Sequence, residues 1–320
     1  MRLLRTQQYE LLEEKDFPGQ CPPYAILSHT WISAKEEITY QDLKTRRQDI
    51  DNGIYKQRGW AKVKQYCDRA WRDGWKFAWM DTCCIDKANA ADTQEAINAM
   101  FRWYQNAVVC YAHFEDVDVN RSVLEADRID LDVPESGDLD DRPGTIQIAD
   151  QGNVLRRAIA PSLVQAKWFT RGWTLQELLA PHYLIFVDQS WRRIGTRECW
   201  APEIREACGI EAKQLISFDP TDFVSCSIAM RLSWASRRST TVEEDESYSL
   251  LGLFGVSLPL IYGEGRWRAF NRLQRELIMT YNDDSIFAWT FKSPRTSLNA
   301  PGNQNSKSFC KCKELSSWPN

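Results

Sequence analysis

Residues 59–86, GWAKVKQYCDRAWRDGWKFAWMDTCCID, place a helix directly before a short apolar strand. Apolar side chains recur at three- and four-residue spacing between Val63 and Trp71, which is the periodicity of one helical face. Gly74 follows the last periodic residue, and a glycine in that place commonly ends a helix. The apolar run after it predicts a strand near 76–81.

The alternation continues on both sides of this unit. YAILSHTW at 24–31 predicts an earlier strand, and VVCYAHF at 108–114 predicts a later one. Between them, DTQEAINAMFRWYQN at 92–106 has helical periodicity, with Asp92 or Thr93 in a position to cap it. Strands and helices that alternate at short intervals indicate an α/β fold, in which helices cover a parallel sheet.

A last helix and strand complete the expected sheet. WFTRGWTLQELLAP at 168–181 predicts one helix, capped by Thr170 and ended by Pro181. HYLIFVD at 182–188 predicts a strand after it. We therefore expect parallel strands near 24–29, 76–81, 108–114 and 182–188, with helices between them.

The chain divides by composition into parts of different character. Residues 115–142 hold eleven acidic side chains and three arginines, which predicts a solvated insertion. Helices are expected near 201–208, 222–236, 243–254 and 264–281, with a short strand at 285–291. We expect a first domain over 1–195 with its core at 24–181, a helical subdomain over 196–292, and a disordered tail over 293–320.

Charge and cysteine content exclude several classes of protein. The 320 residues carry 40 basic and 44 acidic side chains, and a nucleic-acid partner is not expected of a net charge of -4. Ten scattered cysteines and three histidines show no zinc-ligand spacing, so no metal is expected. No apolar run approaches the ~20 residues that span a bilayer. The start, MRLLRTQQYELLEEKD, becomes acidic too early for a secretory signal, so a cytoplasmic protein is expected.

Polar side chains at the ends of the predicted strands are the first candidates for a site. P-loop, GxGxxG, GxSxG and HExxH motifs are absent from the sequence. Ser28, His29 and Thr30 end the first strand, and Asp81 ends the second. Ligands of parallel α/β sheets bind at the carboxyl ends of strands, so these residues are candidate substrate contacts.

Trp173 and Glu177 form a second candidate pair. Four residues apart on the expected helix, they would share one face. An aromatic ring beside a carboxylate suits a cationic or ring-bearing ligand. The alternative is structural: Trp173 is a core residue, and Glu177 pairs with Arg171 or serves as a cap.

Four blocks of this sequence resemble, in order, the signature blocks of the fungal heterokaryon incompatibility (HET) domain. They are YAILSHTW, residues 59–86, EAINAMFRWYQNAVVCYAHFEDV at 95–117, and WFTRGWTLQELLAP. RLSWASRRSTTVEEDESYSLLGLFGVSLPLIYGEG at 231–265 resembles the helical segment that often follows this domain. The resemblance implies a role in vegetative incompatibility, a fungal self/non-self response that ends in growth arrest or cell death.

HET domains are in turn distantly similar to Toll/interleukin-receptor (TIR) domains, which have flavodoxin-like parallel sheets. The resemblance implies that Trp173 to Glu177 matches their W-x-x-x-E, whose glutamate is catalytic in members that cleave NAD. Glu177 would then stabilise an oxocarbenium-like transition state. Because nicotinamide leaves as a neutral molecule, no general acid is required. Trp173 or Trp31 would stack on a ring of the substrate.

Two functions therefore remain open from the sequence. One is an NAD-cleaving effector, with NAD as substrate and no resident cofactor. The other is a non-enzymatic death-signalling adaptor that acts through self-association. In either case self-association and an incompatible allelic or signalling partner are expected. A Glu177 carboxylate that solvent can reach in a pocket would favour the enzyme, and one tied to Arg171 on a filled surface would favour the adaptor.

Overall fold

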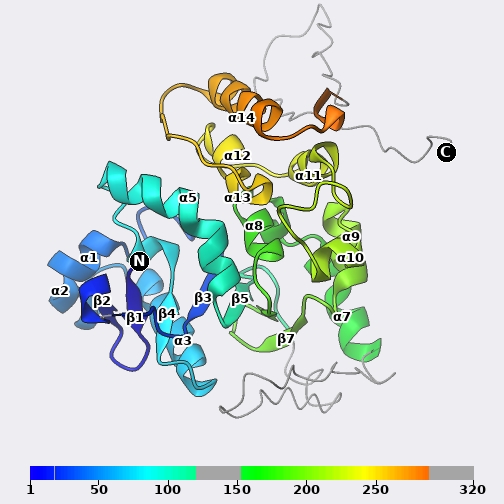
Figure 1. Ribbon diagram of the computed structural model, residues 1–320. Coiled ribbons are helices and arrows are strands. Elements are labelled where there is room, and N and C mark those ends of the chain that lie inside the picture. The colour runs from blue at the N-terminus through cyan, green and yellow to red at the C-terminus, as the bar shows by residue number, and fades with distance from the viewer. Residues whose placement is uncertain (18, 120–152, 288–320) are drawn as a thin grey trace, which may run out of the picture.

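The structure is a computed structural model that describes residues 1–17, 19–119 and 153–287 (Figure 1). Its centre is a seven-stranded sheet in the order β2-β1-β4-β3-β5-β6-β7. The strands are β1 Leu3–Arg5, β2 Glu10–Leu12, β3 Ala25–His29, β4 Phe77–Trp79, β5 Val109–His113, β6 Leu184–Val187 and β7 Arg193–Thr196.

The four predicted strands form the parallel middle of this sheet. β3 pairs in parallel with both β4 and β5, and β5 pairs in parallel with β6, which confirms the predicted α/β fold. In chain order these strands lie 2-1-3-4, the arrangement of flavodoxin-like sheets. The chain leaves β3 toward β4 on one side and returns to β5 on the other. The carboxyl ends of β3 and β5 therefore meet at a topological switch point, where such folds bind ligands.

Three short antiparallel strands extend the sheet at its edges. β1 pairs with β2 and β4, and β7 pairs with β6. The sequence did not predict them. They have only three or four residues, and a stretch of that length carries too little periodicity to be recognised.

Helices cover both faces of the sheet. The first half of the chain contains α1 Tyr40–Thr45, α2 Arg47–Asp51, α3 Gln57–Arg72, α4 Asp81–Cys84 and α5 Ala90–Asn106. Two short 3-10 helices are η1 Glu14–Asp16 near the N-terminus and η3 Lys167–Thr170 in the second half. α3 lies in the crossover from β3 to β4, and α5 lies in the crossover from β4 back to β5. The two crossovers run in opposite directions across the sheet, so the helices lie on opposite faces (Figure 1). Apolar side chains fix both helices: Tyr66 of α3 and Tyr104 of α5 are buried.

The predicted cap of α5 was wrong. Asn89, not Asp92 or Thr93, accepts the backbone N–H groups of residues 91 and 92. Asp92 instead pairs with Arg2 at 2.7 Å, which ties the N-terminal strand to this helix. An ion pair across 90 residues leaves no trace in local spacing.

The single helix predicted at 168–181 was also wrong. The segment is split into η3 and α8 Thr174–Leu179, because the chain between them pairs with Ser239. Gly172 N–H donates to Ser239 O (3.0 Å), and Ser239 N–H donates to Thr170 O (2.8 Å). These bonds replace the helical ones, so Trp173 stands at the N-cap of α8 and not inside a helix.

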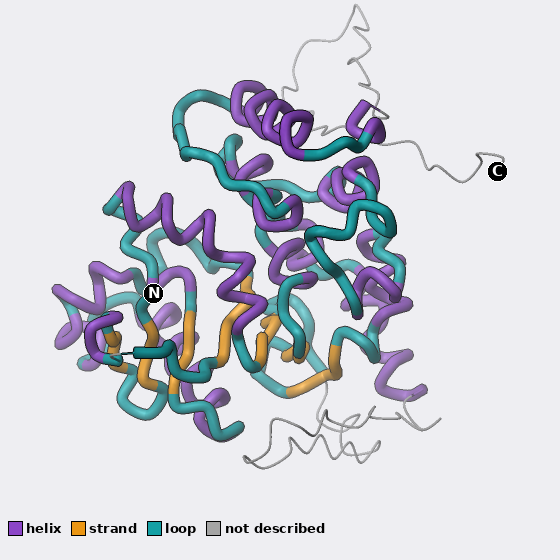
Figure 2. Tube along the Cα trace, in the orientation of Figure 1, coloured by secondary structure: helices purple, strands orange, loops and turns teal. Residues whose placement is uncertain are grey.

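The second half of the described chain is mostly helical, as predicted. It contains α7 Asn153–Val164, α9 Ala201–Cys208, α10 Ala212–Ile216, α11 Ile228–Ala235, α12 Asp245–Tyr248, α13 Leu251–Phe254 and α14 Arg266–Thr280. Figure 2 shows this helical part beside and above the sheet. The strand expected at 285–291 was wrong as far as it is described, since Asp284–Phe287 is the 3-10 helix η4. Most of the acidic stretch, from 120 on, and the expected tail at 293–320 lie outside the described residues.

Among the described residues, no helix is long and apolar enough to cross a membrane.

Candidate functional site

The candidate site lies at the carboxyl end of β3 and divides between the two faces of the sheet. Ser28 and His29 are consecutive in β3, so their side chains point to opposite faces. Ser28 meets α8, whereas His29 meets Asp81 at the start of α4. Thr30 contributes its backbone carbonyl, which accepts a bond from Lys62. The predicted strand-end residues are therefore neighbours, but they build two clusters.

The first cluster joins Ser28 to Glu177 of α8. The Ser28 hydroxyl donates a hydrogen bond to Glu177 Oε2, and Trp168 Nε1–H donates to Ser28 Oγ at 2.8 Å. Trp168 of η3 and Ser28 are fully buried, and Glu177 is 7% exposed. Arg171 does not pair with the carboxylate: its guanidinium reaches the hydroxyl of Thr241 (3.4 Å). Glu177 is therefore neither a carboxylate that solvent reaches freely nor one paired with Arg171, the two arrangements considered from the sequence.

Burial raises the pKa of Glu177 to about 8, and the negative charge of Asp81 acts in the same direction. The hydrogen bond from Ser28 and the charge of Arg171 oppose this shift without cancelling it. Glu177 is therefore largely protonated at neutral pH in the ligand-free protein. A buried carboxyl with a strongly perturbed pKa is typical of a functional site.

The second cluster surrounds Asp81. Its carboxylate contacts His29 Nε2 at 2.9 Å, accepts Trp31 Nε1–H at 3.1 Å, and pairs with Lys87 at 2.9 Å. The Lys87 ammonium also lies 3.6 Å from the centroid of the Trp31 ring. Burial alone would raise the pKa of Asp81, but Lys87 and His29 lower it well below its usual range. Asp81 is thus a carboxylate that already holds a cation against an aromatic ring.

A buried ion pair, not predicted from the sequence, lies next to His29. Lys62 of α3 donates to Glu37 at 2.7 Å and to the carbonyl of Thr30 at 2.9 Å. Glu37 also accepts the backbone N–H of Ile32 at 2.8 Å and lies 4.0 Å from His29 Nδ1. This pair fixes the chain where it leaves β3. Lys62 falls on the buried side of an amphipathic helix, which was the only signal in the sequence.

Trp173 belongs to a third group, whose hydrogen-bond partners differ from those of Glu177. Its indole N–H donates to Asp245 Oδ2 of α12 at 3.1 Å, and Tyr262 O–H donates to Asp245 Oδ1 at 2.9 Å. Trp173 has helical backbone angles and its carbonyl accepts the Glu177 N–H at 3.5 Å, so the two residues keep the expected one-turn spacing, but their side chains have different hydrogen-bond partners. No local spacing pointed to Asp245, because its partners lie 72 and 17 residues away.

The two cysteines of the site region, Cys83 and Cys84, are buried thiols with raised pKa values, so they are poor nucleophiles. Burial raises the pKa of Cys84 to about 12 and raises that of Cys83 well above its usual range. Both side chains are buried. Within the part of the chain that the structure describes, no group of His, Cys, Asp or Glu side chains is arranged to hold a metal ion.

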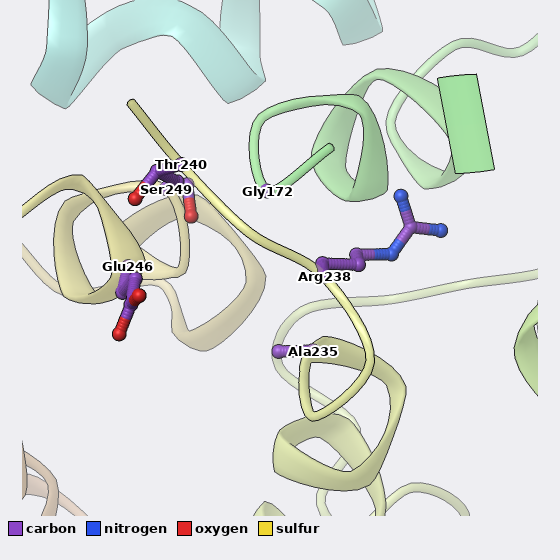
Figure 3. A pocket seen from close by; sticks show the side chains of 6 residues that line it. All are labelled: Gly172, Ala235, Arg238, Thr240, Glu246 and Ser249. Carbon is purple, nitrogen blue, oxygen red and sulfur yellow. The ribbon is translucent and has the colours of Figure 1, made fainter. Parts of the chain in front are cut away.

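A small hollow lies beside the turn that precedes α8 (Figure 3). It is lined by Gly172, Ala235, Arg238, Thr240, Glu246 and Ser249. The Arg238 side chain extends away from Ser249 and Glu246 and donates to Arg171 O (3.0 Å) and Thr174 Oγ1 (2.8 Å). The space, about 10 Å³ for a water-sized molecule, holds no more than a single water.

Comparison with known proteins identifies the relatives of this chain. The family model for the heterokaryon incompatibility protein (HET) matches residues 24–177, which run from the residue before β3 into α8 and include both Ser28 and Glu177. The chain is 41% identical over 283 residues to vegetative incompatibility protein HET-E-1 of Podospora anserina. That match covers 87% of this chain and 18% of the relative, so the chain spans less than a fifth of its length. No solved structure matches significantly.

The fold is an α/β domain with a buried carboxyl at its switch point, followed by a mostly helical part. The chain belongs to the HET-domain family.

Proposed function

We propose that this chain is an effector of heterokaryon incompatibility whose α/β domain cleaves the bond between nicotinamide and ribose in NAD. The observation that supports this proposal most directly is Glu177, a buried carboxyl at the switch point with a pKa of about 8 and a serine as its hydrogen-bond partner. The flavodoxin-like order of the parallel strands agrees with the likeness to TIR domains on which this proposal draws.

The chemistry requires a carboxylate near the carbon that loses nicotinamide. The pyridinium ring of NAD carries a positive charge, so its binding favours the ionised form of Glu177. As the glycosidic bond breaks, its electron pair goes to the ring nitrogen, and nicotinamide leaves as a neutral molecule. The ionised carboxylate stabilises the positive charge that develops on the ribose. Water then attacks that carbon and loses a proton, and ADP-ribose is the second product.

Each side chain of the site has a defined part in this proposal. Ser28, held by Trp168, orients the Glu177 carboxyl. Asp81, His29 and Trp31 at the neighbouring strand end serve as substrate contacts, since polar groups and an exposed ring face meet there. The free NAD that such an enzyme consumes is found in the cytoplasm, where we place its action.

A non-enzymatic adaptor that acts by self-association is the second candidate. The observation that favours it is the low exposure of Glu177, 7%, because a covered, hydrogen-bonded carboxyl also fits a purely structural role. Under this alternative the chain signals by assembling with further copies or with an allelic partner.

Incubation of the purified full chain with NAD separates the two candidates. The enzyme releases nicotinamide and ADP-ribose in equal amounts, with a specific activity that rises with protein concentration if self-association completes the site. A folded protein that releases no nicotinamide at any concentration, yet arrests growth when expressed in a fungal host, is the adaptor.

A further inference from the structure

A cation already lies on an exposed aromatic face just after the end of β3. The Nζ of Lys87 is 3.6 Å from the centroid of the Trp31 ring, and it pairs with Asp81 Oδ2 at 2.9 Å. Trp31 Nε1–H donates to the same oxygen at 3.1 Å. The ring, the carboxylate and the ammonium therefore form one cluster, in which each member contacts the other two.

Asp81 does not depend on Lys87 for its orientation. It is the first residue of α4, and its other carboxylate oxygen, Oδ1, contacts His29 Nε2 at 2.9 Å. The His29 side chain is only 2% exposed, so packing holds it in place. If Lys87 leaves, Asp81 Oδ2 keeps the bond from Trp31 and loses the one from Lys87. The position beside the ring then becomes free for another cation.

The backbone that carries Lys87 is fixed, whereas its side chain can turn away. Lys87 N–H donates to Ile85 O at 3.1 Å, and Asp86 N–H donates to Asp92 Oδ2 at 2.6 Å. Gln41 Nε2 donates to both carboxylate oxygens of Asp86 at 3.0 Å. The ammonium can therefore leave the ring by side-chain rotation alone, and the loop between α4 and α5 stays where it is.

Solvent reaches this cluster. Trp31 is 37% exposed, and the side chains of Lys87 and Asp81 are 38% and 19% exposed. An ion pair at such a position contributes little to stability, and a lysine ammonium is strongly hydrated once it turns into water. A ligand that makes the same two contacts as Lys87 can therefore displace it.

The two contacts also select the chemistry of the ligand. A positive charge over an indole face is attracted by the ring, and the neighbouring carboxylate adds to that attraction. A planar cation with delocalised charge covers more of the ring than an ammonium does, and it is more weakly hydrated. It requires no hydrogen-bond donor, because its charge alone faces the carboxylate. A neutral ring of the same size lacks this electrostatic attraction.

We propose that Trp31 and Asp81 form a subsite for a planar organic cation, and that Lys87 occupies this subsite in the ligand-free protein and leaves it when the ligand binds. The inference rests on the proposed function for one point, that the cation is the pyridinium ring of NAD. Lys87 acts as an internal competitor, since the apparent affinity for a ligand falls with the fraction of the protein whose site is free.

Calorimetric binding of two small probes to the full chain tests the subsite without turnover. 1-Methylnicotinamide is a planar cation, and nicotinamide is a neutral ring of similar size. We expect the wild type to bind the cation about fivefold more tightly. Trp31→Ala removes the ring and should abolish this preference, whereas Trp31→Phe keeps an aromatic face and should retain most of it. Equal binding of both probes by the wild type would overturn the inference.

Lys87→Ala tests the internal competitor. Without the ammonium, binding of the cation should tighten about fivefold, while binding of the neutral probe should not change. Lys35→Ala removes another exposed positive charge, four residues from Trp31, and is the matched control that should leave both affinities nearly unchanged. The Lys87 side chain is exposed, so its loss should not unfold the protein. Unchanged or weaker binding of the cation by Lys87→Ala would overturn the inference.

Nuclear magnetic resonance of the full chain, isotopically labelled at the lysine ε-carbon, observes the displacement itself. While the ammonium lies on the Trp31 ring, the ring current shields the ε-methylene protons of Lys87, so their signal lies upfield of those of exposed lysines. The signal that is missing in Lys87→Ala identifies them. Saturating 1-methylnicotinamide should return this signal to the range of exposed lysines. A signal that stays in place while the cation binds would show that Lys87 is not displaced and would overturn the inference.

The outcome for cleavage is scored separately. If the wild type releases nicotinamide from NAD while Lys87→Ala gains no affinity for the cation, the inference is wrong and the proposed function stands. If the cation displaces Lys87 but no nicotinamide is released from NAD, the cation subsite stands and the cleavage is wrong.

Discussion

The hydroxyl of Ser28 on β3 donates a hydrogen bond to the carboxylate of Glu177 on α8, 149 residues further along the chain. The bond joins the first strand of the parallel sheet to the helix before its last strand. Trp168 completes the arrangement by donating to the same hydroxyl, so the serine has both a donor and an acceptor. Burial raises the pKa of this carboxyl although the charge of Arg171 opposes the shift, and the raised pKa makes the stability of the protein depend on pH.

Stability should fall as the pH rises from about 4.5 to about 8. The pKa of Glu177 is raised from its ordinary 4.5 to about 8 in the folded protein, so the folded state binds the proton more tightly than the unfolded chain does. This contribution to the free energy of unfolding is fully present below the pKa of the unfolded chain and is lost as the pH rises through the pKa of the folded protein. Its upper limit is about 5 kcal/mol. Urea unfolding at pH 5.5, 7 and 8.5 measures this slope.

Glu177→Gln is the control for that slope, because the amide does not titrate. Its unfolding free energy should change less between pH 5.5 and 8.5 than that of the wild type. Equal slopes in the two proteins would mean that Glu177 does not bind its proton more tightly in the folded state.

Gly172→Ala should destabilise the protein by about 1–3 kcal/mol, the usual effect of overpacking. A Cβ at this position would lie 2.4 Å from Thr240 Cγ2, and Gly172 is also the residue that bonds to Ser239. The turn that begins α8 would then have to shift. Thermal and urea unfolding of the purified variant measure the effect.

The matched double variant identifies the cause. Thr240→Ser removes the clashing methyl group, and the next atom is Ser249 Oγ at 3.4 Å, an ordinary contact. Gly172→Ala with Thr240→Ser should therefore recover most of the loss. A double variant as unstable as the single one would show that the steric explanation is wrong.

Lys62→Met should cost about 3–5 kcal/mol, since it leaves the buried Glu37 carboxylate without its cation. Adding Glu37→Gln should restore much of that loss, because the neutral pair no longer buries a single charge. Lys64→Met, on the exposed side of the same helix, should change stability by no more than about 0.5 kcal/mol. Unfolding free energies of the four proteins decide between an ion pair and a simple packing effect.

The parallel core could be predicted because apolar runs of four or more residues alternate with periodic helices. Burial of these strands on both faces requires such runs, as in β5 and β6, where every residue is buried. The edge strands β1 and β7 could not be predicted. Their positions depend on pairing with β4 and β6, and only the folded sheet provides those partners.

The candidate residues were visible in the sequence, but their partners were not. Ser28 and Glu177 were both singled out, yet helical spacing paired Glu177 with Trp173 instead. The backbone keeps that spacing, but the Glu177 side chain bonds to Ser28 and the Trp173 side chain to Asp245, 149 and 72 residues away in sequence. Local periodicity describes one element at a time, and this site is made of bonds between elements.

Glu177→Gln should lower NAD cleavage about 10²–10³-fold while the protein stays folded. Because the pKa of Glu177 is about 8, the wild-type side chain is largely protonated at pH 7 and resembles the neutral amide in shape and charge. Ser28 keeps an oxygen to donate to. The substitution therefore removes only the carboxylate that forms when the cationic substrate binds. Nicotinamide release and far-UV circular dichroism measure the two properties together.

Growth of a fungal host that overexpresses each variant extends this test to the biological function. Glu206→Gln, an exposed glutamate of α9, is the matched control and should remain as active and as toxic as the wild type. If cleavage causes the arrest, Glu177→Gln should release the host from it. A folded Glu177→Gln protein that still arrests growth would refute the enzymatic mechanism and leave self-association as the cause. Loss of both activity and arrest with the fold intact assigns the arrest to a single ionisable group, which a structural carboxyl that is already protonated cannot explain.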